Sequence, residues 1–183
     1  MAAQLYRCVN ERRTVLSDRN CGDCTACCDG WLSAATLEMR PGKPCKNRCD
    51  AGCGIYEDRP EDPCRLFRCG WLQGVLPDDE SWRPDKSGAI LLTGRGPTGW
   101  KSAWRLVPTG ICIEEDALEG FKELAVAASN PLIWIRRQED FSTALNQTVH
   151  RYAIGPADFL SALKWDFSDD DVWDLAPGRS EGP

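Results

Sequence analysis

Four cysteines fall within eight residues in "NCGDCTACCDG" (residues 20–30), where Cys21-x-x-Cys24-x-x-Cys27 is followed directly by Cys28. Two-residue spacing lets a turn aim successive sulfurs and backbone N–H groups at one centre. The same register opens the bacterial ferredoxin pattern, in which cysteines hold an iron–sulfur cluster. Because neighbouring side chains diverge in an extended backbone, Cys27 and Cys28 are expected to serve different atoms or different metals.

The chain carries many more thiols than this one stretch. Its 183 residues include 11 cysteines, and the single histidine, His150, lies far from them in sequence. A metal site in the cysteine-rich part must therefore be built almost wholly from sulfur. Five further cysteines lie between residues 45 and 69: Cys45, Cys49, Cys53, Cys64 and Cys69.

The amino-terminal sequence bears on the redox state of these thiols. Residues 1–20 contain no apolar run long enough for a secretory signal, and no stretch approaches the roughly 20 apolar residues of a membrane span. We therefore expect a soluble, cytoplasmic protein. Thiols stay reduced in that compartment. Dense cysteines therefore predict metal binding in preference to a disulfide-stapled binding module.

The charge balance narrows the expected partners. Lys and Arg number 22 against 28 Asp and Glu, a net charge of −6. Nucleic-acid binding needs clustered positive charge, so no nucleic acid is expected, and no membrane. The expected partners are a metal ion and, if the cysteine segment is an interaction module, another protein. The terminal "DFSDDDVWDLAPGRSEGP" (residues 166–183) predicts an acidic, solvated tail, with a docking strand formed around Trp173 and Leu175 as the alternative.

The patterning predicts an α+β fold. Residues 1–75 form a cysteine-rich, metal-binding segment that is too poor in hydrocarbon to fold alone, and a bound metal would supply the missing stability. We expect this irregular, metal-stapled segment to pack on a small α+β unit at residues 76–183, in one compact domain overall. In that unit we predict a hairpin of two strands, a helix, a third strand and a second helix at residues 88–94, 100–107, 114–129, 131–136 and 156–165.

Three motifs, "CGDCTACC" (21–28), "GCGIYEDRP" (52–60) and "CRLF" (64–67), resemble the cysteine-cluster (CxxCxxCC) family, described as a zinc- or iron-chelating domain. The resemblance covers Cys21–Phe67. One relative in that family, a flagellin lysine methylase, has a similar cysteine motif, which implies redox or group-transfer chemistry as an alternative. The resemblance implies ligand roles for Cys21, Cys24, Cys27, Cys28, Cys45, Cys53 and Cys64.

The sequence thus predicts a metal-binding protein that holds zinc or iron, with an iron–sulfur redox or group-transfer enzyme as the alternative. No pattern identifies a catalytic residue. Two closed zinc sites would use eight thiolates, and basic residues between positions 40 and 69 would offset their charge. The separate Cys112 is expected to be a small buried hydrophobe. The predicted ligands are Cys21, Cys24, Cys27, Cys28, Cys45, Cys53, Cys64 and Cys69, with the role of Cys49 left open.

Overall fold

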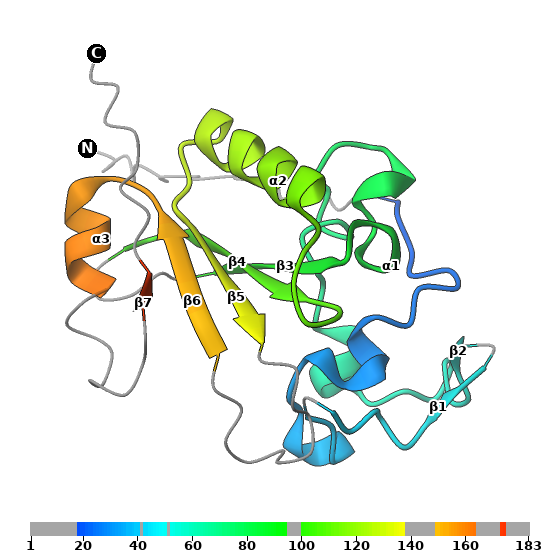
Figure 1. Cartoon of the computed structure of the whole chain (residues 1–183). Helices are drawn as coiled ribbons and strands as arrows, with labels where there is room; N and C mark the ends of the chain where they lie inside the picture. The colour runs from blue at the N-terminus through cyan, green and yellow to red at the C-terminus, as the bar shows by residue number, and fades with distance from the viewer. Residues whose placement is uncertain are drawn as a thin grey trace, which may run out of the picture.

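The computed structural model describes residues 18–40, 42–50, 52–94, 100–137, 149–163 and 173–174. Within them, helices and two β-sheets combine, so the predicted α+β class is confirmed. A five-stranded sheet forms the centre, and the cysteine-rich part lies beside β3, the strand at one edge of that sheet (Figure 1). No helix in the described ranges has the length and apolar character needed to cross a membrane.

The large sheet has the strand order β3-β4-β5-β6-β7. The predicted hairpin is present, since β3 and β4 pair antiparallel from Ala89↔Pro108 to Gly94↔Ala103; its loop, residues 95–99, lies outside the described residues. β4 and β5 run parallel because a helix crosses between them, and β5 and β6 are antiparallel. The strands are β3 (Ala89–Gly94), β4 (Ala103–Pro108), β5 (Leu132–Arg137), β6 (Val149–Ile154) and β7 (Trp173–Asp174).

Two helices cover opposite faces of this sheet. In α2 (Glu115–Ala127), Phe121 and Ala125 are four residues apart and therefore share one buried face. They join the buried cluster that contains Leu132 and Trp134 of β5, while α3 (Ala157–Leu163) packs against Ile133. Because alternate side chains of a strand point to opposite faces, α2 and α3 sandwich the sheet, and both predicted helices are present.

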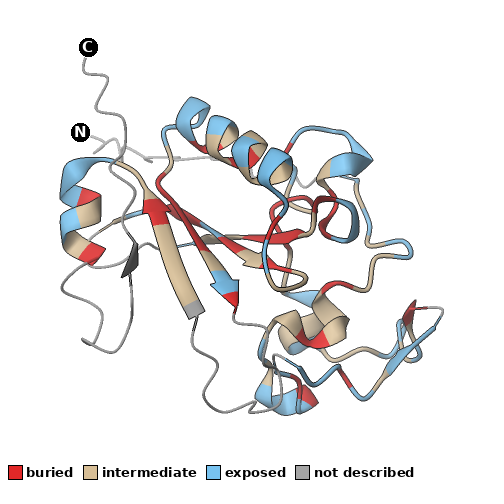
Figure 2. Cartoon of the chain, in the orientation of Figure 1, coloured by how far each residue is buried: buried red, intermediate tan, exposed pale blue. Residues whose placement is uncertain are grey.

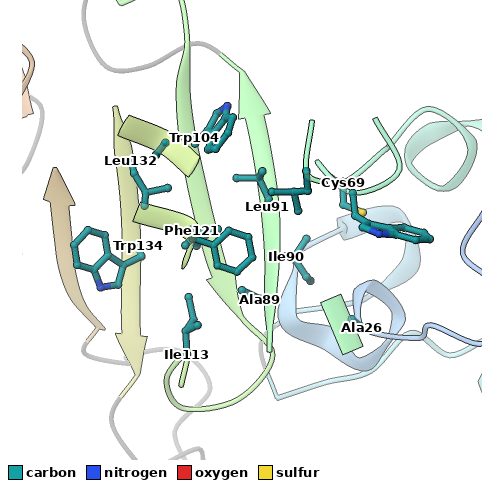
Figure 3. Packing of buried hydrophobic residues seen from close by; sticks show 14 residues of the cluster. Ala26, Cys69, Ala89, Ile90, Leu91, Trp104, Ile113, Phe121, Leu132 and Trp134 are labelled. Carbon is teal, nitrogen blue, oxygen red and sulfur yellow. The ribbon is translucent and has the colours of Figure 1, made fainter. Parts of the chain in front are cut away.

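The cysteine-rich part shares its core with the sheet. The backbone N–H of Gly70 donates to the Leu91 carbonyl at 2.7 Å, which attaches this segment to the free edge of β3. Ala26 and Cys69 belong to the same buried cluster as Leu91 and Phe121. Figure 3 shows Ala26 and Cys69 on the side of β3 away from β4. The segment therefore gains a hydrophobic anchor that its own composition lacks.

Within the cysteine-rich part, regular structure is short and irregular. Buried residues concentrate on β3, β4 and β5, whereas half-buried and exposed residues dominate the cysteine segment (Figure 2). A short helix, α1 (Pro84–Ser87), follows the segment and leads into β3. The remaining elements are single turns at Cys27–Trp31, Ala35–Leu37, Glu61–Arg65 and Glu80–Trp82, and the two-stranded pair β1 (Arg48–Cys49) and β2 (Gly52–Cys53).

Two sequence expectations are corrected. Trp173 and Asp174 do not belong to a solvated tail but pair with Arg151 and Tyr152 of β6, as the alternative of a docking strand at Trp173 has it, and they cover an otherwise open strand edge. The rest of the predicted tail, residues 166–172 and 175–183, lies outside the described residues. Cys112 is exposed, because the next residue, Ile113, takes the buried position.

Candidate metal site

Thiols from separate parts of the segment line one cavity of about 380 Å³. Cys49, on β1, is exposed and is not part of the wall, and His150 lies on β6 away from it. None of the ten described cysteines is in a disulfide. The cavity is lined by all eight cysteines predicted as ligands: Cys21, Cys24, Cys27, Cys28, Cys45, Cys53, Cys64 and Cys69.

The first hook of the cysteine motif is a tight turn. The N–H of Cys24 donates to the Cys21 carbonyl at 2.9 Å, and the N–H of Gly22 donates to Asn20 Oδ1 at 3.0 Å. Gly22 has φ +53°, a left-handed conformation that glycine adopts without steric cost. The turn thus brings Cys21 and Cys24 to the same wall of the cavity.

The adjacent pair Cys27-Cys28 begins a second turn. The N–H of Cys28 donates to the Thr25 carbonyl at 2.7 Å, and the Cys28 carbonyl accepts from the N–H of Cys45 at 2.8 Å. At Gly30, φ is +85° and an added Cβ would lie 2.6 Å from the Lys43 carbonyl oxygen. Only glycine allows the chain that carries Cys45 to approach this turn so closely.

A strand pair and a third turn fix two further cavity cysteines, Cys53 and Cys64. Arg48 of β1 is paired with Cys53 of β2, and its Nε donates to Asp29 Oδ1 at 2.6 Å, which ties β1 to the Cys27–Trp31 turn. Cys64 lies in the turn Glu61–Arg65. These contacts link sequence-distant thiols through backbone pairing and one ion pair.

The cavity thiols divide between two hydrophobic clusters. Cys69 is buried in the main core, with Cys24 and Cys27 packed against that core. Cys45 is buried in a smaller cluster with Leu37 and Met39, and Cys28 and Cys64 pack against it. The neighbours Cys27 and Cys28 therefore belong to different clusters.

Burial favours the protonated form of six of the eight cavity thiols in the absence of metal. It raises the pKa of Cys24 to about 12, although an N–H from Ala26 that hydrogen-bonds to the sulfur opposes the shift. It raises the pKa of Cys28 to about 11, with further increases from Cys53 and Cys45. Burial is also the largest cause of the raised pKa of the thiols at Cys21, Cys27, Cys64 and Cys69.

Two of the basic residues expected near the thiols act on Cys21. Burial raises the Cys21 pKa, and the charges of Arg59 and Arg68 lower it. Other basic residues of the segment pair elsewhere, such as Lys43 with Glu38 at 3.2 Å. Arginine charge next to Cys21 therefore comes from Arg59 and Arg68.

Unpaired donors also line the cavity. Nε of Arg59 and Nε1 of Trp71 are buried and have no hydrogen-bond partner among the described residues. Buried polar groups are nearly always paired, so each such donor indicates a missing acceptor. Thiolate or sulfide sulfur is an acceptor of the required kind, and this observation fits a sulfur-ligated metal.

One carboxylate touches the thiols without having been predicted. Asp85 in α1 is hydrogen-bonded to the thiol of Cys24. Arg83 holds this carboxylate through two bonds, at 2.7 Å to Oδ1 and 2.8 Å to Oδ2. Trp71, too, was not predicted as a cavity residue. The sequence around Asp85 and Trp71 does not mark either residue as part of the cavity. Their place there depends on how the cysteine segment folds back on α1 and β3.

The thiols share a cavity wall without being gathered around one point. In the part of the chain that the structure describes, no group of three or more His, Cys, Asp or Glu side chains is arranged to hold a metal ion. Coordination would require the sulfurs to lose their protons and draw together, as thiolate ligands must. An all-thiol donor set suits zinc or iron. The metal-stapled description of the segment stays a prediction.

The structure is an α+β fold with a thiol-lined cavity beside strand β3 of its five-stranded sheet. No protein-family profile matches the chain. No curated protein and no solved structure matches it either. The resemblance to the cysteine-cluster family therefore remains a prediction carried by its three motifs.

Proposed function

We propose that this is a cytoplasmic metal-binding protein that holds zinc or iron through the thiolates of its cysteine cavity. One observation carries the proposal: eight unbridged thiols, drawn from the range Cys21–Cys69, line a single cavity. Apolar packing alone does not require cysteine at eight positions of one wall, whereas a thiophilic metal does.

The surroundings of individual sulfurs support the same function. The sulfur of Cys69 accepts hydrogen bonds from the backbone N–H groups of Leu72 and Trp71. The sulfur of Cys24 accepts one from Ala26, and Arg59 and Arg68 supply positive charge near Cys21. Donors and cations of this kind stabilise thiolates and tune the metals they bind.

The experiment is to purify the full chain without oxygen and to measure zinc, iron and acid-labile sulfide per chain. We expect zinc or iron in stoichiometric amounts, retained through gel filtration and released when the thiols are alkylated. A chain that is purified free of metal, and that takes up neither zinc nor iron when reduced, would contradict the proposal.

The second candidate is an iron–sulfur protein with a redox or group-transfer role. It is favoured by the size of the cavity, about 380 Å³, since a water molecule takes only about 30 Å³ in the liquid and a lone ion needs little room. The unpaired N–H groups of Arg59 and Trp71 favour it too, because cluster sulfides accept such bonds. A bound cluster would supply one-electron chemistry.

Colour separates the two candidates. An iron–sulfur protein is brown, with broad absorbance near about 400 nm that bleaches on reduction, and it contains sulfide. A colourless protein that contains zinc and no sulfide would support the first candidate and count against the second.

A further inference from the structure

We infer that the cavity holds two separate metal positions, each made by four cysteines, and not one shared centre. The inference rests on the proposed function and specifies its ligands. The first group is Cys21, Cys24, Cys27 and Cys69, and the second group is Cys28, Cys45, Cys53 and Cys64.

Packing separates the groups. Cys69 is 3% exposed in the main core, where Cys24 and Cys27 pack against the same cluster. Cys45 is 7% exposed in the smaller cluster with Leu37 and Met39, and Cys28 and Cys64 pack there. Three members of the first group therefore belong to the main core, and three members of the second group belong to the smaller cluster.

Backbone contacts place the two remaining members. The Cys21 carbonyl accepts from the N–H of Cys24 at 2.9 Å, which keeps Cys21 in the same turn as Cys24 of the first group. Cys53 is paired with Arg48, whose Nε donates at 2.6 Å to Oδ1 of Asp29, the residue that directly follows Cys28. These contacts assign Cys21 to the first group and Cys53 to the second.

Backbone contacts explain how each group is assembled. In the first group, the N–H of Cys24 donates to the Cys21 carbonyl and closes the turn, and the Cys24 thiol is hydrogen-bonded to Asp85. In the second group, the N–H of Cys45 donates to the Cys28 carbonyl at 2.8 Å, and Cys53 is paired with Arg48. The single peptide bond between Cys27 and Cys28 joins the two positions.

Four thiolates per position match the ligand number of closed zinc sites and of iron–sulfur clusters. All eight cavity thiols are used, and the exposed Cys49 is left over. A single four-ligand centre would leave four of the eight cavity thiols without a metal.

The test titrates the reduced, metal-free full chain with cobalt(II), which reports four-thiolate coordination through its absorption spectrum. The wild-type chain should bind about two equivalents in four-thiolate sites. The within-group variants Cys21→Ser/Cys24→Ser and Cys53→Ser/Cys64→Ser should each retain about one such equivalent. The mixed variant Cys24→Ser/Cys64→Ser should retain none, although it too carries only two substitutions.

Cys49→Ser is the matched control and should keep both equivalents. All substituted thiols in the three double variants are half-buried, and far-UV circular dichroism checks that each variant keeps its helices and sheet. A within-group variant that loses all four-thiolate cobalt while still folded, or a mixed variant that keeps one equivalent, overturns the two-group assignment. A wild-type chain that binds one equivalent overturns it as well, whereas one that binds no metal defeats the proposed function itself.

Discussion

The guanidinium group of Arg137 lies over the indole ring of Trp31, 5.0 Å from its centroid, and Nη2 donates to the Trp31 carbonyl at 3.4 Å. Trp31 ends the turn that begins with the Cys27-Cys28 pair, and Arg137 ends β5. Nη1 of the same side chain donates to the carbonyls of Pro108 and Gly110 at 2.6 and 2.7 Å. One buried cation therefore connects the turn that carries Cys27 and Cys28 to the sheet.

Replacing that cation should destabilise the whole domain. Arg137→Met leaves the carbonyls of Pro108 and Gly110 without their donor, and we expect a loss of about 2 to 4 kcal/mol in the free energy of unfolding. Burial lowers the Arg137 pKa to about 10, so the side chain is still charged at neutral pH. Urea unfolding measures the loss.

Arg136 is the control for this substitution, because it is the preceding residue of β5 and is exposed. Arg136→Met should change the unfolding free energy by no more than about 0.5 kcal/mol. Equal unfolding midpoints for the two variants would show that the Arg137 contacts do not stabilise the fold.

The close approach at Gly30 gives a second prediction. Gly30→Ala places Cβ 2.6 Å from the backbone oxygen of Lys43, so the chain leading to Cys45 must move. Gly42 has a similar positive φ, +79°, but nothing lies within 4 Å of its added Cβ. Both alanine variants pay the left-handed strain of about 1 to 2 kcal/mol, and only Gly30→Ala adds a backbone clash.

We therefore expect Gly30→Ala to lower both the thermal midpoint and the bound metal well below the values for Gly42→Ala. Thermal unfolding and elemental analysis on the same preparations provide the comparison. If the two variants bind equal metal, the approach of Lys43 to Gly30 is not needed to position Cys45.

Ligand assignment gives a third prediction. Cys24→Ser should lower the metal bound per chain by about half in the two-position arrangement, because it removes one of four ligands from one position. Cys112→Ala should leave metal content unchanged, since Cys112 is exposed and lies outside the cavity. Equal metal content in wild type and Cys24→Ser would count against the assignment of Cys24.

The protonation of the cavity thiols makes metal uptake depend on pH. The pKa of Cys24 is raised to about 12 and that of Cys28 to about 11, so both carry protons in the metal-free protein at pH 7. Bound metal needs thiolates, and the metal-free state therefore holds more protons than the loaded state. By linkage, the affinity for zinc should rise with pH and fall as the solution is acidified.

Isothermal titration of zinc in buffers with different ionisation enthalpies measures the protons released. We expect several protons per zinc at pH 7, and weaker binding at pH 6 than at pH 8. A binding enthalpy that is independent of the buffer would mean that the thiols are already ionised, contrary to the effect of their burial.

Local patterns predicted much of the regular structure. The 3.6-residue apolar period of residues 114–129 predicted α2, and Pro156 marked the start of α3. The hairpin of β3 and β4 and the strand β5 followed from short apolar runs between turn residues. These elements are determined by interactions between residues close in sequence, which is why spacing alone reveals them.

The sequence was a poorer guide to which residues meet when they lie far apart along the chain. Cys112 was expected to be buried and is exposed. For Trp173 a solvated tail was favoured over a docking strand, but the residue pairs with β6. α1 carried no clear pattern, because four residues are too few for a helical period. Each of these outcomes depends on a partner that lies far away along the chain.

The sequence alone determined which thiols are candidates for metal binding, because cysteine spacing and the lack of nearby histidine are properties of the chain itself. Only the tertiary structure decided which thiols share a surrounding, that Cys49 lies outside the cavity, and that Asp85 and Trp71 lie at its wall or contact its sulfurs. The physical reason is that burial depends on three-dimensional packing: the sheet edge at β3 supplies the hydrophobic surface on which the cysteine segment folds, and no spacing rule encodes that surface.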